Sequence, residues 1–202
     1  MLESVIRTYY DRLLVAPIAK RLIGIVSPSQ ITLASGILGF LVFLVLLINL
    51  PILAVILLLL SGYCDTLDGA VARLSHQISN QGAVYDIVCD RFVEFFVILG
   101  LFSLDPNHRA WAAMFMLGSV LICITSFLVV GVFSQNTSEK SFHYSPGLME
   151  RPEAFIFFMV MMIWPHSFNW LAPVFSLLVI LTAGLRVFEF SKTDVLPNRP
   201  LA

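Results

Sequence analysis

The sequence predicts an all-α membrane protein in which six transmembrane helices follow an amphipathic helix at the membrane interface. Of the 202 residues, 58% are hydrophobic and only 12% are charged, and the mean hydropathy is +0.90. Both values lie well outside the balance of a water-soluble globular domain. A spanning helix needs roughly 20 apolar residues, so six helices use most of the chain. We therefore expect residues 1–202 to form one membrane domain.

The first segment, residues 2–22, places apolar residues such as Leu13 and Ile18 at helical spacing against Lys20 and Arg21. This pattern is typical of a helix that rests on the membrane instead of crossing it. Apolar runs follow, divided by residues that favour turns. The predicted spans are residues 30–48, 52–72, 84–104, 110–133, 153–168 and 170–190.

Lysine and arginine are distributed unevenly over the two sides of the predicted bundle. The loops on one side hold only Arg109. The other side holds Arg7, Arg12, Lys20, Arg21, Arg73, Lys140, Arg151, Lys192 and Arg199, with Arg186 near its edge. The positive-inside rule therefore places both termini, and the polar ends of the second and third spans, in the cytoplasm. We expect a multi-pass protein of a bacterial inner (cytoplasmic) membrane. The net charge of −1 gives no basic field for nucleic acid.

Four aspartates lie near the cytoplasmic ends of the second and third predicted spans. Asp65 and Asp68 are three residues apart, and Asp86 and Asp90 are four residues apart, so each pair projects from one helix face. The loop between the two spans is short, which makes these spans antiparallel neighbours with their polar ends on the same side. The two carboxylate pairs are therefore expected to face one space inside the membrane.

Four carboxylates close together inside the membrane repel one another, so they need a counter-charge. One interpretation is an ion-pair network in which Arg73 and Arg91 neutralise two of them, and Glu94, one turn further, could also pair with Arg91. The other is a metal site, because a set of oxygen ligands suits a hard cation such as Mg²⁺ or Mn²⁺. We favour the metal site, with room for two ions.

The residues around the aspartates carry a resemblance to a known family. The stretch Asp65-Thr66-Leu67-Asp68-Gly69-Ala70-Val71-Ala72-Arg73 is followed by Gly82, Asp86 and Asp90. It resembles the signature DxxDGxxAR…GxxxDxxxD of the CDP-alcohol phosphatidyltransferase family, and every specified position is filled. The match covers a small part of the chain, but the predicted interfacial helix, six spans and cytoplasmic site also fit that family.

The resemblance implies a reaction and a role for each motif residue. Asp65, Asp68 and Asp86 would hold two divalent ions, while Asp90 would contribute to the metal site and act as general base. The base would deprotonate an acceptor alcohol, which attacks the β-phosphorus of CDP-diacylglycerol and releases CMP. Family members typically form homodimers, so a homodimer is implied as well.

The resemblance also places a group of residues on the nucleotide side of the site. Pro28-Ser29-Gln30-Ile31-Thr32 resembles a Pro-Asn-x-x-Thr segment of the family, although Ser29 replaces the asparagine and could equally be a helix cap. The implied nucleotide-binding residues are Thr32, Asp65, Gly69, Ala72, Arg73 and Gly82.

The acceptor is expected to bind near the polar connection of residues 134–151 and the ends of the later spans. Arg151 and Arg186 could bind an acceptor phosphate, and Lys140 is a weaker candidate, since cations in loops are often simply solvated. We favour a phosphorylated polyol, such as inositol phosphate or glycerol phosphate, over serine or choline.

Two other functions fit parts of the pattern. A cation- or proton-coupled transporter also places carboxylates in the membrane, but it predicts polar groups near the midplane, whereas these aspartates lie toward one end. A catalytically silent lipid-binding member of the fold needs no general base, and the presence of Asp90 argues against it.

Overall fold

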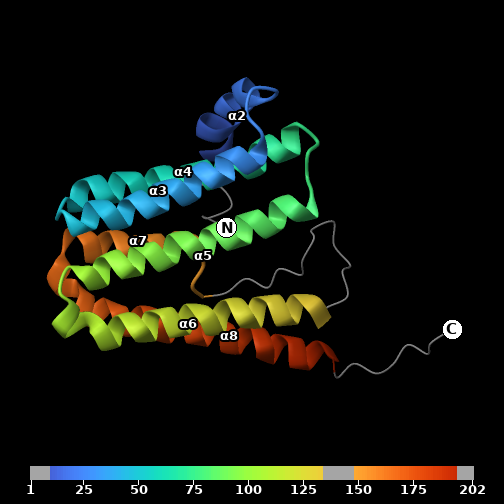
Figure 1. Cartoon of the computed structure of the whole chain (residues 1–202). Coiled ribbons are helices and arrows are strands. Elements are labelled where there is room, and N and C mark those ends of the chain that lie inside the picture. The colour runs from blue at the N-terminus through green and yellow to red at the C-terminus, as the bar shows by residue number, and fades with distance from the viewer. Residues whose placement is uncertain (1–9, 134–147, 195–202) are drawn as a thin grey trace. The chain divides into compact units, whose positions relative to one another are not determined.

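The computed structural model describes residues 10–133 and 148–194 (Figure 1). Within these ranges the chain is helical apart from turns, and no strand occurs in them. The chain divides into two compact units, residues 1–104 and 105–202, and each is described by itself. The first unit contains η1 (Asp11–Val15), α2 (Ala16–Leu22), α3 (Pro28–Leu47), α4 (Pro51–Leu74) and α5 (Asn80–Ser103). The second contains α6 (Pro106–Phe133), α7 (Arg151–Ile163), η2 (Pro165–Ser167) and α8 (Phe168–Asp194).

Local sequence signals set the helix starts in the first unit. Ser27 forms a capping box with Gln30, in which each side chain accepts a hydrogen bond from the other residue's backbone N–H. Ser79 caps α5 by accepting a hydrogen bond from the backbone N–H of Gly82. Proline stands in the first turn of both α3 and α4, where its missing N–H costs nothing.

Helix α3 packs against both α4 and α5, whereas the described parts of α4 and α5 make almost no close backbone contacts with each other. Small residues allow the approach of α3 to α5. A Cβ added to Gly39 would lie 2.5 Å from Cγ2 of Val93, and one added to Gly100 would lie 2.7 Å from Cδ1 of Leu46. Close backbone approach at small residues is the usual means of helix packing inside a membrane.

A reciprocal pair of buried serines joins α3 to α4. The Ser35 hydroxyl donates to the Ser61 carbonyl over 2.9 Å, and the Ser61 hydroxyl donates to the Ser35 carbonyl over 3.0 Å. Both side chains are almost fully buried. These hydrogen bonds join two helices, so they fix the register of α3 against α4. Ser61 lies one helical turn before Asp65, the first residue of the signature motif.

The segment before α3 lies against α4. Val15 and Ala19 are buried together with Leu67, Ala70 and Val71. The Tyr63 hydroxyl donates to the carbonyl of Leu14, within the π-helical turn η1, over 2.9 Å. The outer side leaves Leu13, Ile18, Ile25, Lys20 and Arg21 exposed. Residues 2–9 of the predicted interfacial helix lie outside the described residues, and its place at the membrane surface stays a prediction.

In the part of the chain that the structure describes, four helices are long and apolar enough to cross a membrane: residues Pro28–Leu47, Pro51–Leu74, Pro106–Phe133 and Pro165–Lys192. Helix α5 has 24 residues but carries Asp86, Asp90, Arg91 and Glu94. Helix α7 has only 13 residues, which extend about 20 Å and fall short of a hydrocarbon core of about 30 Å. The predicted number of six spans is therefore not established by these helices.

A buried arginine joins two helices of the second unit. Arg109, in the first turn of α6, donates from Nη2 to the carbonyl of Pro165 over 2.7 Å. Its guanidinium also lies 4.7 Å from the ring centre of Phe168 at the start of α8. The carbonyl satisfies part of its hydrogen-bonding capacity and the aromatic face attracts its charge. Arg109 thus links the start of α6 to the start of α8.

We predict that Gly39→Ala destabilises the protein by about 1 to 3 kcal/mol, because the new methyl group overlaps Val93 in the α3–α5 contact. Adding Val93→Ala should restore part of the loss. Gly118→Ala is the matched control, since a Cβ there meets no atom within 4 Å. Thermal unfolding in detergent gives the stability of Gly39→Ala, of the double variant with Val93→Ala, and of Gly118→Ala. A Gly39→Ala protein as stable as the control would contradict the close packing.

Candidate metal centre

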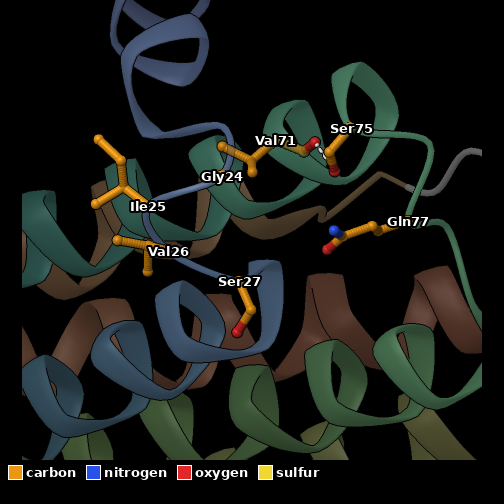
Figure 2. A pocket seen from close by; sticks show the side chains of 7 residues that line it. All are labelled: Gly24, Ile25, Val26, Ser27, Val71, Ser75 and Gln77. Carbon is orange, nitrogen blue, oxygen red and sulfur yellow. Dashed lines mark hydrogen bonds between the residues drawn. The ribbon is translucent and has the colours of Figure 1, made fainter.

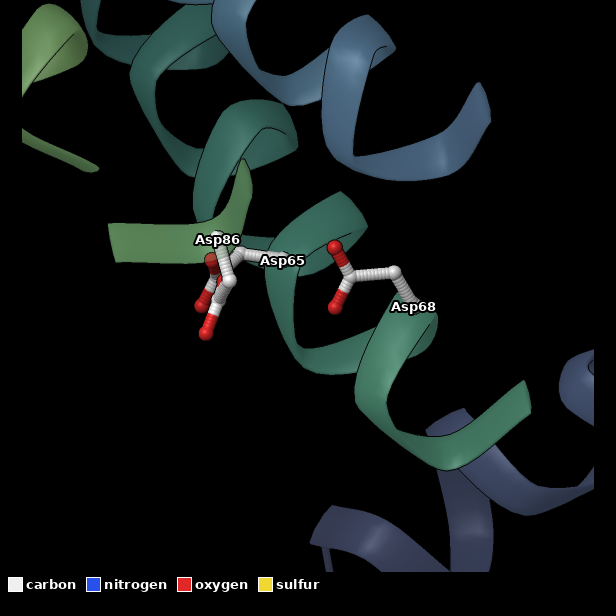
Figure 3. A group of neighbouring side chains, drawn as sticks. All are labelled: Asp65, Asp68 and Asp86. Carbon is white, nitrogen blue, oxygen red and sulfur yellow. The ribbon is translucent and has the colours of Figure 1, made fainter. Parts of the chain in front are cut away.

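The carboxylates of Asp65, Asp68 and Asp86 come together in the first unit (Figure 3). Each offers one oxygen, and these oxygens all lie within 4.8 Å of one another. Asp65 and Asp68 project from α4, and Asp86 projects from the first half of α5. Asp68 is buried, and Asp65 and Asp86 are half-buried. The structure thus brings the two halves of the signature motif to one point, as the sequence predicted.

This oxygen set fits a hard divalent cation. Mg²⁺ binds oxygen at about 2.1 Å in octahedral geometry, so two oxygens on the same ion lie no more than about 4.2 Å apart. The separations of up to 4.8 Å need only a small closing movement, or two ions that share the ligands. Like charges this close repel strongly where water is scarce, and a cation between them removes that cost.

Asp90 lies one helical turn beyond Asp86 on α5 and is half-buried. It is not among the three carboxylates that lie mutually close in the described residues. Its assigned roles as fourth ligand and general base therefore stay predictions.

Thr32, on α3, is buried and donates from its hydroxyl to Oδ2 of Asp68. The hydroxyl oxygen of Thr32 also lies 3.1 Å from the carbonyl oxygen of Pro28, one turn earlier in α3. The family resemblance places Thr32 on the nucleotide side, whereas the structure shows it in direct contact with a carboxylate of the cluster. The residues around Thr32 in the sequence do not indicate that its side chain contacts a residue of another helix.

The remaining motif residues border the cluster. Arg73 is exposed, and its Nη1 would lie 3.3 Å from a Cβ added to Gly69, so the arginine side chain lies across that glycine. Ala72 is half-buried in the last turns of α4, and Gly82 lies in the first turn of α5. Whether these residues contact a nucleotide stays a prediction.

Arg91 forms an ion pair with Glu94, with 2.6 Å between Nη1 and Oε2. Glu94 is buried, with 5% of its surface exposed. The pairing that the sequence allowed between these two residues is therefore present. An arginine engaged three residues along its own helix is a poor counter-charge for the aspartates, which argues against the part of the ion-pair network that depends on Arg91.

A cavity of about 200 Å³ lies where α2, α3 and α4 approach their ends (Figure 2). Its lining includes Val71 of α4 and Ser75 directly after that helix, together with Gln77 and the connection from Gly24 to Ser27. Val71 follows Gly69 by two positions, which corresponds to a rotation of about 200° around the helix. The cavity therefore opens on a different face of α4 from Gly69. Sequence reasoning gave no indication of it.

The arginines predicted to bind the acceptor lie in the second unit. Arg186 of α8 donates from Nη1 to the carbonyl of Cys123 over 3.1 Å, and its guanidinium lies 5.2 Å from the ring centre of Phe127. Arg151 begins α7, with its guanidinium 5.3 Å from the ring centre of Phe155. Lys140 lies outside the described residues.

A hydrogen bond connects the regions of these two arginines. The backbone N–H of Met149, just before α7, donates to the hydroxyl of Thr182 over 2.9 Å. Thr182 precedes Arg186 by one helical turn. Arg151 and Arg186 therefore belong to the same end of the second unit.

Comparison with known proteins supports the resemblance of the signature. The model of the CDP-alcohol phosphatidyltransferase family matches residues 25–187. The inner membrane protein YnjF of Escherichia coli is 28% identical over 171 residues, which cover 81% of this chain and 82% of that protein. A bifunctional IPC transferase and DIPP synthase of Archaeoglobus fulgidus is 30% identical over 145 residues, covering 71% of this chain but only 29% of that protein. The chain therefore spans less than a third of the archaeal relative.

A solved structure has the same fold. The phosphatidylinositol phosphate synthase of Mycobacterium tuberculosis, in complex with manganese and citrate, aligns with a TM-score of 0.76 and 19% identity. The alignment covers 93% of this chain and 94% of that chain. A structure of the same synthase with CDP-DAG bound aligns equally well. The names of these relatives give the transporter alternative no support.

We predict that Asp68→Asn weakens Mn²⁺ binding by at least about 100-fold, because loss of a direct ligand exceeds the 10- to 100-fold cost typical of an outer-shell partner. Asp105→Asn is the control. A hydrogen bond with His108 lowers the pKa of Asp105, so Asp105 is a charged, half-buried carboxylate outside the cluster. The electron paramagnetic resonance signal of free Mn²⁺ measures binding. Equal affinity in both variants would place the metal elsewhere.

Proposed function

Because the chain belongs to the CDP-alcohol phosphatidyltransferase family, we propose that it transfers a phosphatidyl group from CDP-diacylglycerol to an alcohol and releases CMP. The observation that carries this proposal is the meeting of Asp65, Asp68 and Asp86 at one point of the complete family signature. The relative from M. tuberculosis, whose fold the chain shares, has been captured with CDP-DAG, which supports this donor.

Asp65, Asp68 and Asp86, with a contribution from Asp90, would hold two ions of Mg²⁺ or Mn²⁺. When bound, such ions offset the negative charge that develops on the phosphate oxygens and on the departing CMP. The manganese complex of the same relative supports this choice of cations.

Asp90 is proposed as the general base. Its carboxylate would take the proton of the acceptor hydroxyl, which requires hydrogen-bond contact between the two groups. The hydroxyl oxygen then bonds to the β-phosphorus, and the bond from that phosphorus to the oxygen bridging to the α-phosphate breaks. CMP leaves with the electron pair of the broken bond. Placing the base on the same helix as Asp86 keeps proton removal close to the reacting phosphate.

Residues around the cluster would bind the nucleotide. Gly69 and Gly82 lack side chains, so a diphosphate could approach the backbone there. Arg73, which lies across Gly69, would pair with the diphosphate. Asp65 and Ala72 complete this set. The family resemblance alone assigns Thr32 to the nucleotide, since the structure shows its hydroxyl on Asp68.

The acceptor is proposed to be a phosphorylated polyol, with inositol phosphate as the first choice. Relatives from Mycobacteroides abscessus and Corynebacterium glutamicum are named phosphatidylinositol phosphate synthases. The planar guanidinium groups of Arg151 and Arg186 are suited to paired hydrogen bonds with a phosphate, and Lys140 would add a third charge.

The membrane arrangement is also part of the proposal. We place the chain in a bacterial inner membrane as one six-span domain that forms a homodimer, with both termini and the carboxylate cluster facing the cytoplasm. The excess of Lys and Arg on that side supports this orientation. The name of the E. coli relative, an inner membrane protein, agrees with the location.

Purified protein in detergent should release CMP from CDP-diacylglycerol when given Mg²⁺ or Mn²⁺ and one member of an acceptor panel. The panel contains inositol phosphate, glycerol phosphate, inositol, serine and choline, and we expect release only with a phosphorylated polyol. Chelation of the metal should stop the reaction. Absence of metal-dependent CMP with every acceptor would argue against the proposed activity.

Asp90→Asn should lower kcat at least about 100-fold, since general-base catalysis typically contributes 10²- to 10⁴-fold. Binding of CDP-diacylglycerol, measured by titration calorimetry, should remain detectable in this variant. Asp105→Asn again serves as the control for loss of a carboxylate. Near-normal turnover of Asp90→Asn would remove Asp90 as the base.

Arg186→Gln should raise KM for the phosphorylated acceptor at least about 10-fold, because hydrogen bonds to a charged group contribute about 1.5 to 3 kcal/mol. KM for CDP-diacylglycerol should stay unchanged, since the donor is assigned to residues of the first unit. Initial rates of CMP release with one substrate varied at a time separate the two constants. Arg21→Gln, an exposed arginine in α2, is the control. A rise confined to the donor KM would contradict the assignment.

A further inference from the structure

We propose that Thr32 is a positioning residue that holds Asp68 in the orientation needed for metal binding. The inference rests on the proposed role of Asp68 as a metal ligand. It gives Thr32 a different task from the nucleotide contact that the family resemblance implies. Thr32 would act through the carboxylate and would not need to touch the substrate.

The first support is the contact itself. The Thr32 hydroxyl donates to Oδ2 of Asp68, and both residues are buried, with 4% and 5% of their surfaces exposed. A hydroxyl has only one proton to donate, and the nearby carbonyl of Pro28 competes for it. An ionised carboxylate is a stronger acceptor than a backbone carbonyl, so the Thr32 hydroxyl points its proton at Asp68 and keeps it. In this environment no bulk water replaces the hydrogen bond if it is lost.

The second support is that Thr32 and Asp68 stand on helices whose register is fixed. Ser35 and Ser61, which lie one and two turns from this pair along their helices, exchange reciprocal hydrogen bonds between α3 and α4. Thr32 itself lies one turn into α3, just after the capping box of Ser27. The hydroxyl therefore meets Asp68 from a rigid support on a neighbouring helix.

The consequence for metal binding follows from the freedom of a carboxylate to rotate. An aspartate side chain turns easily about its last bond, so its oxygens sample many directions. A hydrogen bond at Oδ2 restricts that rotation and fixes the direction of Oδ1. Partners of this kind orient metal ligands in many proteins, and their loss typically costs about 10- to 100-fold in metal affinity.

The test compares variants that keep or remove the hydroxyl. Mn²⁺ affinity is measured on the full-length protein in detergent, without nucleotide, by electron paramagnetic resonance. Thr32→Val keeps the shape and removes the hydroxyl, and we expect it to bind Mn²⁺ about 10- to 100-fold more weakly. Thr32→Ser retains the hydroxyl and should stay within about threefold of the original protein. Thr32→Ala is the second variant without a hydroxyl and should resemble Thr32→Val.

Ser35→Ala is the matched control. It also removes a buried hydroxyl of α3 that bonds to α4, but its partner is Ser61 and not a carboxylate of the cluster. The hydrogen bond from the Ser61 hydroxyl to the carbonyl of residue 35 remains in this variant and still joins the two helices. Mn²⁺ affinity should therefore stay within about threefold of the original protein, even if thermal stability falls. A fall in affinity equal to that of Thr32→Val would show that general loosening of α3 is the cause, and would overturn the proposal.

Steady-state rates separate positioning from nucleotide contact. At saturating Mn²⁺, Thr32→Val should recover most of kcat and keep KM for CDP-diacylglycerol within about threefold. Unchanged Mn²⁺ affinity with a raised donor KM would overturn the proposal and restore the nucleotide role. If the original protein binds Mn²⁺ but releases no CMP, the proposed reaction fails while the inference about Thr32 stands. If the original protein binds no Mn²⁺, both fail.

Discussion

The close approach of α3 to α4 and α5 is the constraint on which the candidate site depends. The aspartates of the signature stand on α4 and α5, yet the described parts of these helices make almost no close backbone contacts with each other. Their separation is set through α3, which meets α5 at Gly39 and α4 at the Ser35–Ser61 pair. A larger residue at either contact would move one half of the carboxylate cluster away from the other. The glycine and serine of α3 therefore belong to the architecture of the site, although they carry no chemistry.

Electrostatics explains why a neutral group suits the contact with Asp68. Three carboxylates at this spacing attract a cation only while their negative charge remains available. An arginine between them would neutralise the charge and compete with the metal. A threonine hydroxyl restrains Asp68 and adds no charge, and Arg91 is instead engaged with Glu94. The structure thus keeps Arg91 from filling the place of the cation.

The sequence predicted the helical class and the carboxylate cluster well, because the signals for both are local. Apolar runs mark buried or lipid-facing helices, and the i,i+3 and i,i+4 spacing of the aspartates puts them on common faces. Helix bounds were less accurate. Helix α5 begins at Asn80 instead of residue 84, because the Ser79 cap brings polar residues into its first turn. The bond from Thr32 to Asp68 joins residues 36 positions apart, and nothing in either neighbourhood marks it. The short length of α7 likewise depends on where Trp164 and Pro165 break the chain.

The division of proposed roles between the two units bears on how specificity could vary within the family. Every residue assigned to the metals and to the nucleotide lies between Thr32 and Asp90, in the first unit, whereas Arg151 and Arg186 lie in the second. The donor chemistry requires fixed carboxylate spacing, so the first unit tolerates little change. The two arginines proposed for the acceptor are under no such spacing constraint, because the proposal assigns them to neither the metals nor the nucleotide. The archaeal relative is named a bifunctional IPC transferase and DIPP synthase, and the relative from Mycobacteroides abscessus a phosphatidylinositol phosphate synthase. An assignment that separates the acceptor residues from the metal centre is compatible with such different names.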